Sequence, residues 1–255
     1  MSSDSEPVVV LDSHSHVLHS DIVGDDYQLS VLPPPSYHQS QDRYPTLYAL
    51  DGPFTFGLVA HGSLLLTFDG IVPELVVVSI GKPLDSMYEW GPTRGRDYSP
   101  LPLPDDETAG HADEFADSLV QEIIPFVEDH YRTRAGDRTL WGQSLGGVFA
   151  LHLLFQRPGI FQRYIATSPA VANATVRLLD HSTLPPAGTS VPARLFTCVG
   201  SDDEEYRDGI ERFQAELAGR NYQDLRYEHV TYPGMHHIAT GASGFIAGLQ
   251  SVFVE

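Results

Sequence analysis

A serine between two glycines, Gly142-Gln-Ser144-Leu-Gly146, is the stretch with the clearest chemical meaning. A serine hydroxyl can attack a carbonyl carbon when it projects from a sharp strand-to-helix turn, and such a turn requires small neighbouring residues. The first helical residue, Leu145, then offers a free backbone N–H beside the hydroxyl. The pattern therefore predicts Ser144 as a nucleophile for acyl transfer and Leu145 as an oxyanion donor.

A nucleophilic serine needs a general base, which is most often histidine. Enzymes with such a turn carry serine, acid and histidine in that chain order, at the carboxyl ends of successive strands. Three of the twelve histidines lie late enough in the chain, namely His229, His236 and His237. His229 falls inside the expected last strand, whereas His236 and His237 follow that strand in a turn. One of these two is therefore the predicted base.

The acid is expected in the turn after the buried strand that ends at Gly200. Asp203 has this position, and its neighbour Asp202 is the alternative. Glu204 and Glu205 are better explained as carboxylates at a helix N-terminus, where the helix dipole favours negative charge. We therefore predict that Asp203 orients the histidine.

A second oxyanion donor is expected in the turn that begins at Asp51. Pro53 has no backbone N–H, so the donor must be Gly52 or Phe54 unless the oxyanion hole is weaker. The loss of one such donor costs roughly a hundredfold in rate or more.

These residues require a sheet whose strands end at one edge. Continuous apolar runs are typical of parallel strands that are covered on both faces. A β-hairpin at residues 7–19 and 27–32 is expected at the sheet edge, and Pro125 is expected to kink the helix at 111–131 or to mark its last turns. The predicted strands are 44–50, 75–81, 138–142, 161–167, 194–200 and 225–232, and the predicted helices are 56–68, 111–131, 145–155, 206–220 and 238–254.

Residues 82–110 form a long irregular loop with aromatic and arginine side chains. Loops of this length in a compact domain are often functional, so Arg96, Trp90 and Tyr98 are predicted substrate contacts. The alternative is that the aromatic rings only fix the loop to the surface. Residues 168–192 are a second insertion, too short for a full lid domain.

Composition excludes several classes of protein. The chain has 255 residues with a formal net charge of −19, which repels nucleic acid and anionic membranes. Cys198 is the only cysteine, so neither a disulfide nor a thiolate zinc cluster can form within the chain. The first residues lack the features of a secretory leader, and no apolar run is long enough to cross a membrane. We expect one cytoplasmic domain spanning residues 1–255.

Three histidines near the N-terminus raise the question of a metal. His14 and His16 are two residues apart and share a strand face, with His19 nearby. A polar strand face explains them without a ligand. We therefore expect no metal and no cofactor.

The chain resembles the esterase D-like branch of the α/β-hydrolases, which includes S-formylglutathione hydrolases, feruloyl esterases, mycolyltransferases and siderophore trilactone esterases. The last part of the chain looks most like the siderophore esterases. The resemblance is carried by residues 22–31 with Pro33, Pro34 and Tyr37, by 44–52, 96–100, 123–126, 142–147, 161–169, 199–200 and 233–237, and by Gly248 with Leu249.

The resemblance implies an α/β-hydrolase fold: a mostly parallel central sheet, an antiparallel N-terminal hairpin and helices on both faces. It places the base at His237, with Met235 where the siderophore esterases usually have glutamate, and it implies that the acid is less critical. The implied activity is hydrolysis of a small-molecule ester, of an aromatic acid or a siderophore lactone, through an acyl-enzyme. Acyl transfer to an alcohol and a non-catalytic binding role are the alternatives.

Overall fold

The apolar runs form one eight-stranded sheet in the computed structural model, which describes residues 9–83, 93–103, 106–171 and 184–254. The strand order is β1-β2-β4-β3-β5-β6-β7-β8, and the last six strands are mutually parallel. Every parallel strand therefore ends at the same edge of the sheet. The strands are β1 (His14–Ser20), β2 (Asp25–Leu32), β3 (Tyr44–Ala49), β4 (Val76–Gly81), β5 (Thr133–Gln143), β6 (Arg163–Thr167), β7 (Ser190–Gly200) and β8 (Gln223–Tyr232).

The N-terminal hairpin is confirmed, with one correction to its bounds. β1 and β2 pair antiparallel with Ser20 opposite Asp25, and Gly24 in the turn has a φ of +71°. The first strand begins at His14 and not at residue 7. Residues 9–13 are not part of any strand, and residues 1–8 lie outside the described part of the chain.

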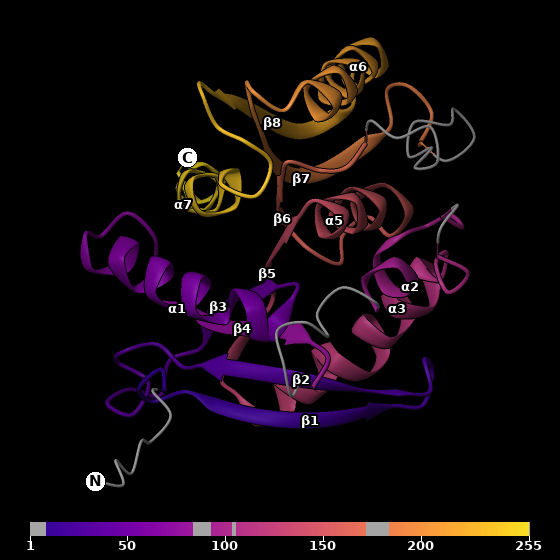
Figure 1. Ribbon diagram of the computed structural model, residues 1–255. Coiled ribbons are helices and arrows are strands. Elements are labelled where there is room, and N and C mark those ends of the chain that lie inside the picture. Colours follow the sequence, from indigo (N-terminus) through magenta and orange to yellow (C-terminus); the bar gives the residue numbers. More distant parts are fainter. Residues whose placement is uncertain (1–8, 84–92, 104–105, 172–183, 255) are drawn as a thin grey trace, which may run out of the picture.

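Helices cover both faces of the sheet (Figure 1). On one face α1 and α7 pack on Trp141, Ile165 and Phe196. On the other face α3 to α6 cover a second apolar cluster, which is why the central strands are buried on both sides. The helices are α1 (Gly52–Phe68), α2 (Arg94–Tyr98), α3 (Ala112–Ser118), a π-helical turn (Leu119–Ile123), α4 (Ile124–His130), α5 (Leu145–Gln156), α6 (Glu204–Arg220) and α7 (Thr240–Phe253).

The kink expected at Pro125 takes the form of a π-helical turn. The predicted helix at 111–131 is divided into α3 and α4 by residues Leu119–Ile123. Pro125 has no backbone N–H, so it cannot donate a hydrogen bond to the helical turn before it. The wider π-helical turn at Leu119–Ile123 therefore costs no hydrogen bond from Pro125. The irregular turn thus lies just before the proline that the sequence indicates.

The single cysteine is a buried packing residue, as expected. Cys198 lies on β7 beneath α7, and a Cβ on Gly244 would approach its Sγ to 2.3 Å. Burial raises the pKa of the Cys198 thiol to about 12, so it stays protonated at neutral pH. In the described residues, no helix is both long and apolar enough to cross a bilayer.

Candidate active site

Ser144 lies on a strained turn between β5 and α5. Its backbone has a φ of 56° and a ψ of −118°, a conformation that a residue with a side chain seldom adopts. The turn is held because the Ser144 N–H donates to the carbonyl of Thr167 and its own carbonyl accepts from Val148 and Ala170. Hydrogen bonds to two neighbouring segments thus fix the position of the hydroxyl.

The two glycines that flank Ser144 are not equivalent. A Cβ on Gly142 would lie 2.2 Å from the carbonyl oxygen of Gly146, so a larger residue cannot fit without moving the turn. A Cβ on Gly146 would have its nearest neighbour at 3.5 Å, which is an ordinary contact. Of the two glycines in the motif, only Gly142 therefore lies where a side chain cannot fit.

The structure brings Ser144, His237 and Asp203 together, of which His237 is predicted by the family resemblance and the other two by their positions in the chain. His237 Nε2 lies 2.8 Å from Ser144 Oγ, and His237 Nδ1 lies 3.0 Å from Asp203 Oδ2. With Nδ1–H donating to the carboxylate, Nε2 is free to accept the serine proton. The histidine and aspartate side chains are only 20% and 13% exposed, so water screens their interaction little.

The carboxylate that contacts His237 is that of Asp203 and not that of its neighbour Asp202. Asp203 is the N-cap residue of α6, yet its carboxylate makes no capping hydrogen bond and faces His237 instead. The Asp202 side chain accepts a hydrogen bond from Ser201. The strand-turn position therefore indicates the carboxylate that the structure places beside His237.

The other two candidate histidines do not reach Ser144. His229 points from β8 to Thr197 and Thr231, at 2.8 and 3.1 Å, and its burial lowers the pKa of the imidazole. His236 is exposed in the turn, and its carbonyl accepts from the Thr240 N–H. Strand pleating directs His229 away from the sheet edge, as its position inside a strand predicts.

Two of the three predicted oxyanion donors have a suitable backbone position. Leu145 and Gly52 are the first residues of α5 and α1, so neither N–H has an acceptor within its own helix. A Cβ on Gly52 would lie 2.5 Å from the N atom of Gly81, so this helix start packs directly on the end of β4.

Phe54 is a correction to the sequence prediction. Its N–H donates to the Asp51 carbonyl at 3.0 Å, because α1 begins at Gly52 and not at residue 56. Phe54 therefore lies in the first helical turn, where its N–H closes the turn, and Gly52 is left as the second donor candidate.

A buried ion pair joins the turn that begins at Asp51 to the turn that carries Ser144. Arg94 donates to both carboxylate oxygens of Asp51, at 2.7 and 3.1 Å, and to the carbonyl of Gln143 at 3.2 Å. The Asp51 N–H donates to the Tyr98 hydroxyl at 3.1 Å. Tyr98 is only 5% exposed, so the structure places it beneath this turn and not on the substrate surface. The predicted substrate contact at Tyr98 is corrected accordingly.

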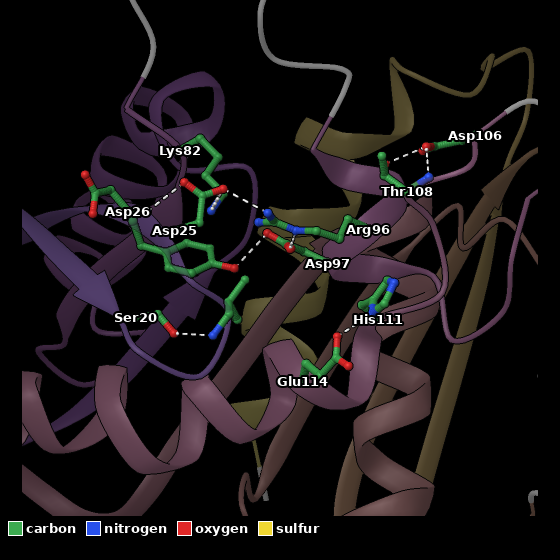
Figure 2. Close-up of polar contacts among 12 residues, drawn as sticks. Ser20, Asp25, Asp26, Lys82, Arg96, Asp97, Asp106, Thr108, His111 and Glu114 are labelled. Carbon is green, nitrogen blue, oxygen red and sulfur yellow. Dashed lines mark hydrogen bonds and ion pairs between the residues drawn. The ribbon is translucent and has the colours of Figure 1, made fainter.

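Arg96 also lies inside a charged network, at the end of the hairpin (Figure 2). It donates to Asp97 at 2.6 Å and to Asp25 at 2.8 Å, and Lys82 pairs with the same Asp25 at 2.8 Å. Tyr27 donates to Asp97 at 2.9 Å. The Arg96 guanidinium therefore bonds to carboxylates of the protein itself, which corrects the prediction that it contacts substrate. The third predicted contact, Trp90, lies outside the described residues.

Asp25 gives a pH-dependent contribution to stability. Although partial burial opposes it, hydrogen bonds from Lys82 and Arg96 lower the pKa of the Asp25 carboxyl from 3.8 to about 2. A carboxyl whose pKa is lower in the folded state stabilises the fold above its unfolded pKa and loses that effect as the pH falls. We expect Asp25→Asn to reduce thermal stability at pH 7, with the difference from wild type shrinking between pH 4 and pH 2.

Thermal unfolding of both proteins across this pH range measures the effect. Asp21→Asn is the matched control, because the Asp21 side chain is 97% exposed and lies 4.0 Å from its nearest partner, His19. A difference for Asp25→Asn that stays constant down to pH 2 would contradict the assigned ion pairs.

Two further residues contact His237, and neither is predicted from the sequence. The ring of Tyr206 stacks on the His237 ring with centroids 4.1 Å apart and planes at 22°. Gln143 donates from Nε2 to the carbonyls of His237 and Ile238. The sequence indication of the Tyr206 contact is its spacing. Tyr206 follows Asp203 by three residues at the start of α6, and residues three apart lie on the same side of a helix.

The N-terminal histidines are held by protein groups. His14 and His16 both bond to the Tyr131 hydroxyl, at 3.1 and 2.7 Å, and His19 bonds to Asp26 at 2.7 Å. In the part of the chain that the structure describes, no group of three or more His, Cys, Asp and Glu side chains could hold a metal ion.

A strained serine turn with histidine and carboxylate gathered above the carboxyl ends of a parallel sheet defines an α/β-hydrolase. The model of the family described as "Putative esterase" matches residues 20–240. The chain belongs to this esterase family, and it is a carboxylic ester hydrolase.

Its relatives include named siderophore esterases, as the sequence resemblance implies. The ferri-bacillibactin esterase BesA of Bacillus subtilis is 26% identical over 231 residues, which is 82% of this chain and 77% of the relative. The siderophore enterobactin esterase of Emericella nidulans is 38% identical over 112 residues, which is 38% of this chain and 36% of the relative.

Solved structures agree in fold. The BES protein from Bacillus cereus superposes with a TM-score of 0.86 at 22% identity, covering 100% of both chains. The siderophore hydrolase EstB from Aspergillus nidulans superposes with a TM-score of 0.81 at 22% identity, covering 96% of this chain and 97% of that one. The α/β-hydrolase fold with a mixed sheet is thereby confirmed.

Proposed function

We propose that the chain hydrolyses esters through an acyl-enzyme on Ser144, with His237 as general base and Asp203 as the orienting acid. The observation that carries the proposal is the 2.8 Å contact between Ser144 Oγ and His237 Nε2. A base at hydrogen-bond distance can take the hydroxyl proton as the oxygen attacks, and this arrangement is shared by unrelated serine hydrolases.

The reaction proceeds in two halves. Ser144 Oγ bonds to the ester carbonyl carbon while its proton moves to His237 Nε2, and the carbonyl oxygen becomes an oxyanion that accepts from the N–H groups of Leu145 and Gly52. The intermediate collapses, the bond between the former carbonyl carbon and the alcohol oxygen breaks, and His237 returns the proton to that oxygen as the alcohol departs. Water then attacks the acyl-enzyme with His237 again as base, which releases the acid and restores the serine.

The substrate we propose is an ester of the kind named for the relatives, a siderophore lactone or another ester of an aromatic acid. The proposal is supported by the similarity to BesA across most of both chains. A panel of short aliphatic p-nitrophenyl esters, a feruloyl ester and a catecholate triserine lactone tests it. The lactone is expected to give the highest kcat/KM. Equal or higher values on the aliphatic esters would reject this substrate class while leaving the serine mechanism in place.

The role of Asp203 gives a separate prediction. Asp203→Asn is expected to lower kcat/KM by about 10²-fold, because the imidazole loses the acceptor that fixes its tautomer. The loss should be smaller than for Ser144 or His237, since Asp203 acts only through the histidine. Steady-state kinetics on p-nitrophenyl acetate measures it, with Asp202→Asn as the matched control. A larger loss for the Asp202 variant would assign the acid to the neighbouring residue.

A further inference from the structure

Gln143 links the serine turn to the loop that carries the base. It is the last residue of β5 and directly precedes Ser144, while its side-chain Nε2 donates to the carbonyls of His237 and Ile238, both at 3.1 Å. The two segments are more than ninety residues apart in the chain. One amide group thus uses both of its protons to hold the histidine loop.

The surrounding contacts leave this amide little freedom. A Cβ on Gly241 would lie 2.0 Å from Gln143 Oε1, so the start of α7 packs against the amide. Thr240 Oγ1 donates to the same His237 carbonyl at 2.7 Å. The position of the His237 backbone is therefore set by Gln143 and Thr240, whereas Asp203 bonds only to the ring.

We propose that Gln143 is a positioning residue that fixes His237 relative to Ser144. This inference rests on the proposed function, because it needs Ser144 and His237 as nucleophile and base. Proton transfer is sensitive to distance, and a displacement of about 1 Å can cost on the order of a hundredfold in rate. Gln143 directly precedes Ser144 in the chain and bonds to the backbone of the histidine loop. It therefore holds the distance between the His237 ring and the Ser144 hydroxyl when the loop moves slightly.

Gln143→Met tests the proposal, since methionine has a similar length and no hydrogen-bond donor. We expect kcat on p-nitrophenyl acetate to fall by about ten- to a hundredfold with KM nearly unchanged. Gln162→Met is the matched control. Gln162 also makes two side-chain bonds to backbone groups, to Gly159 at 3.1 Å and from the Arg138 N–H at 2.9 Å, at the far end of β6. Its kcat should stay at the wild-type value.

A double-mutant cycle separates positioning from a general loss of structure. In the His237→Ala background, adding Gln143→Met should not lower the residual rate further, because there is no imidazole left to misplace. An equal fold-loss in both backgrounds would overturn the proposal, as would a wild-type kcat for Gln143→Met. The proposed function fails in a different way, by full activity of His237→Ala itself.

Gly241→Ala reaches the same contact from the other side. The added methyl group would push on Gln143 Oε1, and because the atoms nearest to it all belong to this side chain and none is a backbone atom, the protein is expected to fold with the amide displaced. The kcat loss and its disappearance in the His237→Ala background should match those of Gln143→Met. This variant decides the question if Gln143→Met proves unstable, and an unchanged kcat in it would count against the proposal.

Discussion

Replacing Ser144 by alanine is expected to lower kcat for ester hydrolysis by roughly 10⁴-fold or more. The hydroxyl is the only group at the turn that can form the acyl-enzyme, and the turn itself should survive, since its backbone hydrogen bonds to Thr167, Val148 and Ala170 do not use the side chain. Steady-state kinetics on p-nitrophenyl acetate measures the loss, and circular dichroism with thermal unfolding shows whether the fold is retained.

Labelling gives an independent test of the same serine. A fluorophosphonate reacts with an activated serine and not with an ordinary one. Mass spectrometry of the labelled wild type is expected to place the adduct on Ser144, and the folded Ser144→Ala protein is expected to stay unlabelled. Full activity of the folded variant, or an adduct on another serine, would end the proposed mechanism.

His237→Ala is the second variant for which we expect a very large effect, a loss in kcat of roughly 10⁴-fold or more. Without the imidazole at 2.8 Å, no described side chain accepts the proton of Ser144 Oγ or returns it to the alcohol. The loss should be larger for an alkyl ester than for a p-nitrophenyl ester, because an alkoxide needs protonation to leave and a nitrophenolate does not.

The neighbouring His236 supplies the matched control. It lies in the same turn and is exposed, so His236→Ala changes the same kind of residue without touching Ser144. Wild-type kcat is expected for it on both esters. If His236→Ala lost activity and His237→Ala kept it, the base would be assigned to the wrong residue of the pair.

Much of the candidate site could be predicted because the order of the residues follows from the topology. In a parallel sheet the carboxyl ends of the strands share one edge, so loops after successive strands meet there. This placed Ser144 after β5, Asp203 after β7 and His237 after β8, and excluded His229 inside a strand. The choice of His237 over His236 needed the family resemblance, because two adjacent residues in a turn differ only in orientation.

The predictions for Arg96 and Tyr98 are wrong because both side chains depend on partners distant in the chain, whereas Phe54 is wrong for a local reason. Arg96 was read as a substrate contact, yet its guanidinium bonds to Asp25, 71 residues away. Tyr98 was read the same way, and its hydroxyl accepts from Asp51, 47 residues away. Phe54 failed as an oxyanion donor because Asp51 adopts a left-handed conformation that starts α1 early. A linear pattern encodes neither the two long-range pairings nor the left-handed backbone of Asp51.

The sequence by itself determined the strand-turn-helix around Ser144, the sheet edge at which the candidate groups meet and their order along the chain. These are local or topological properties, set by apolar periodicity and by the lack of space for a Cβ at Gly142. Only the tertiary structure decided which side chains touch. The stacking of Tyr206 on His237 and the hydrogen bond from the Gln143 amide to the histidine loop are seen only there. Such contacts depend on the directions of side chains in packed elements that are far apart in the chain.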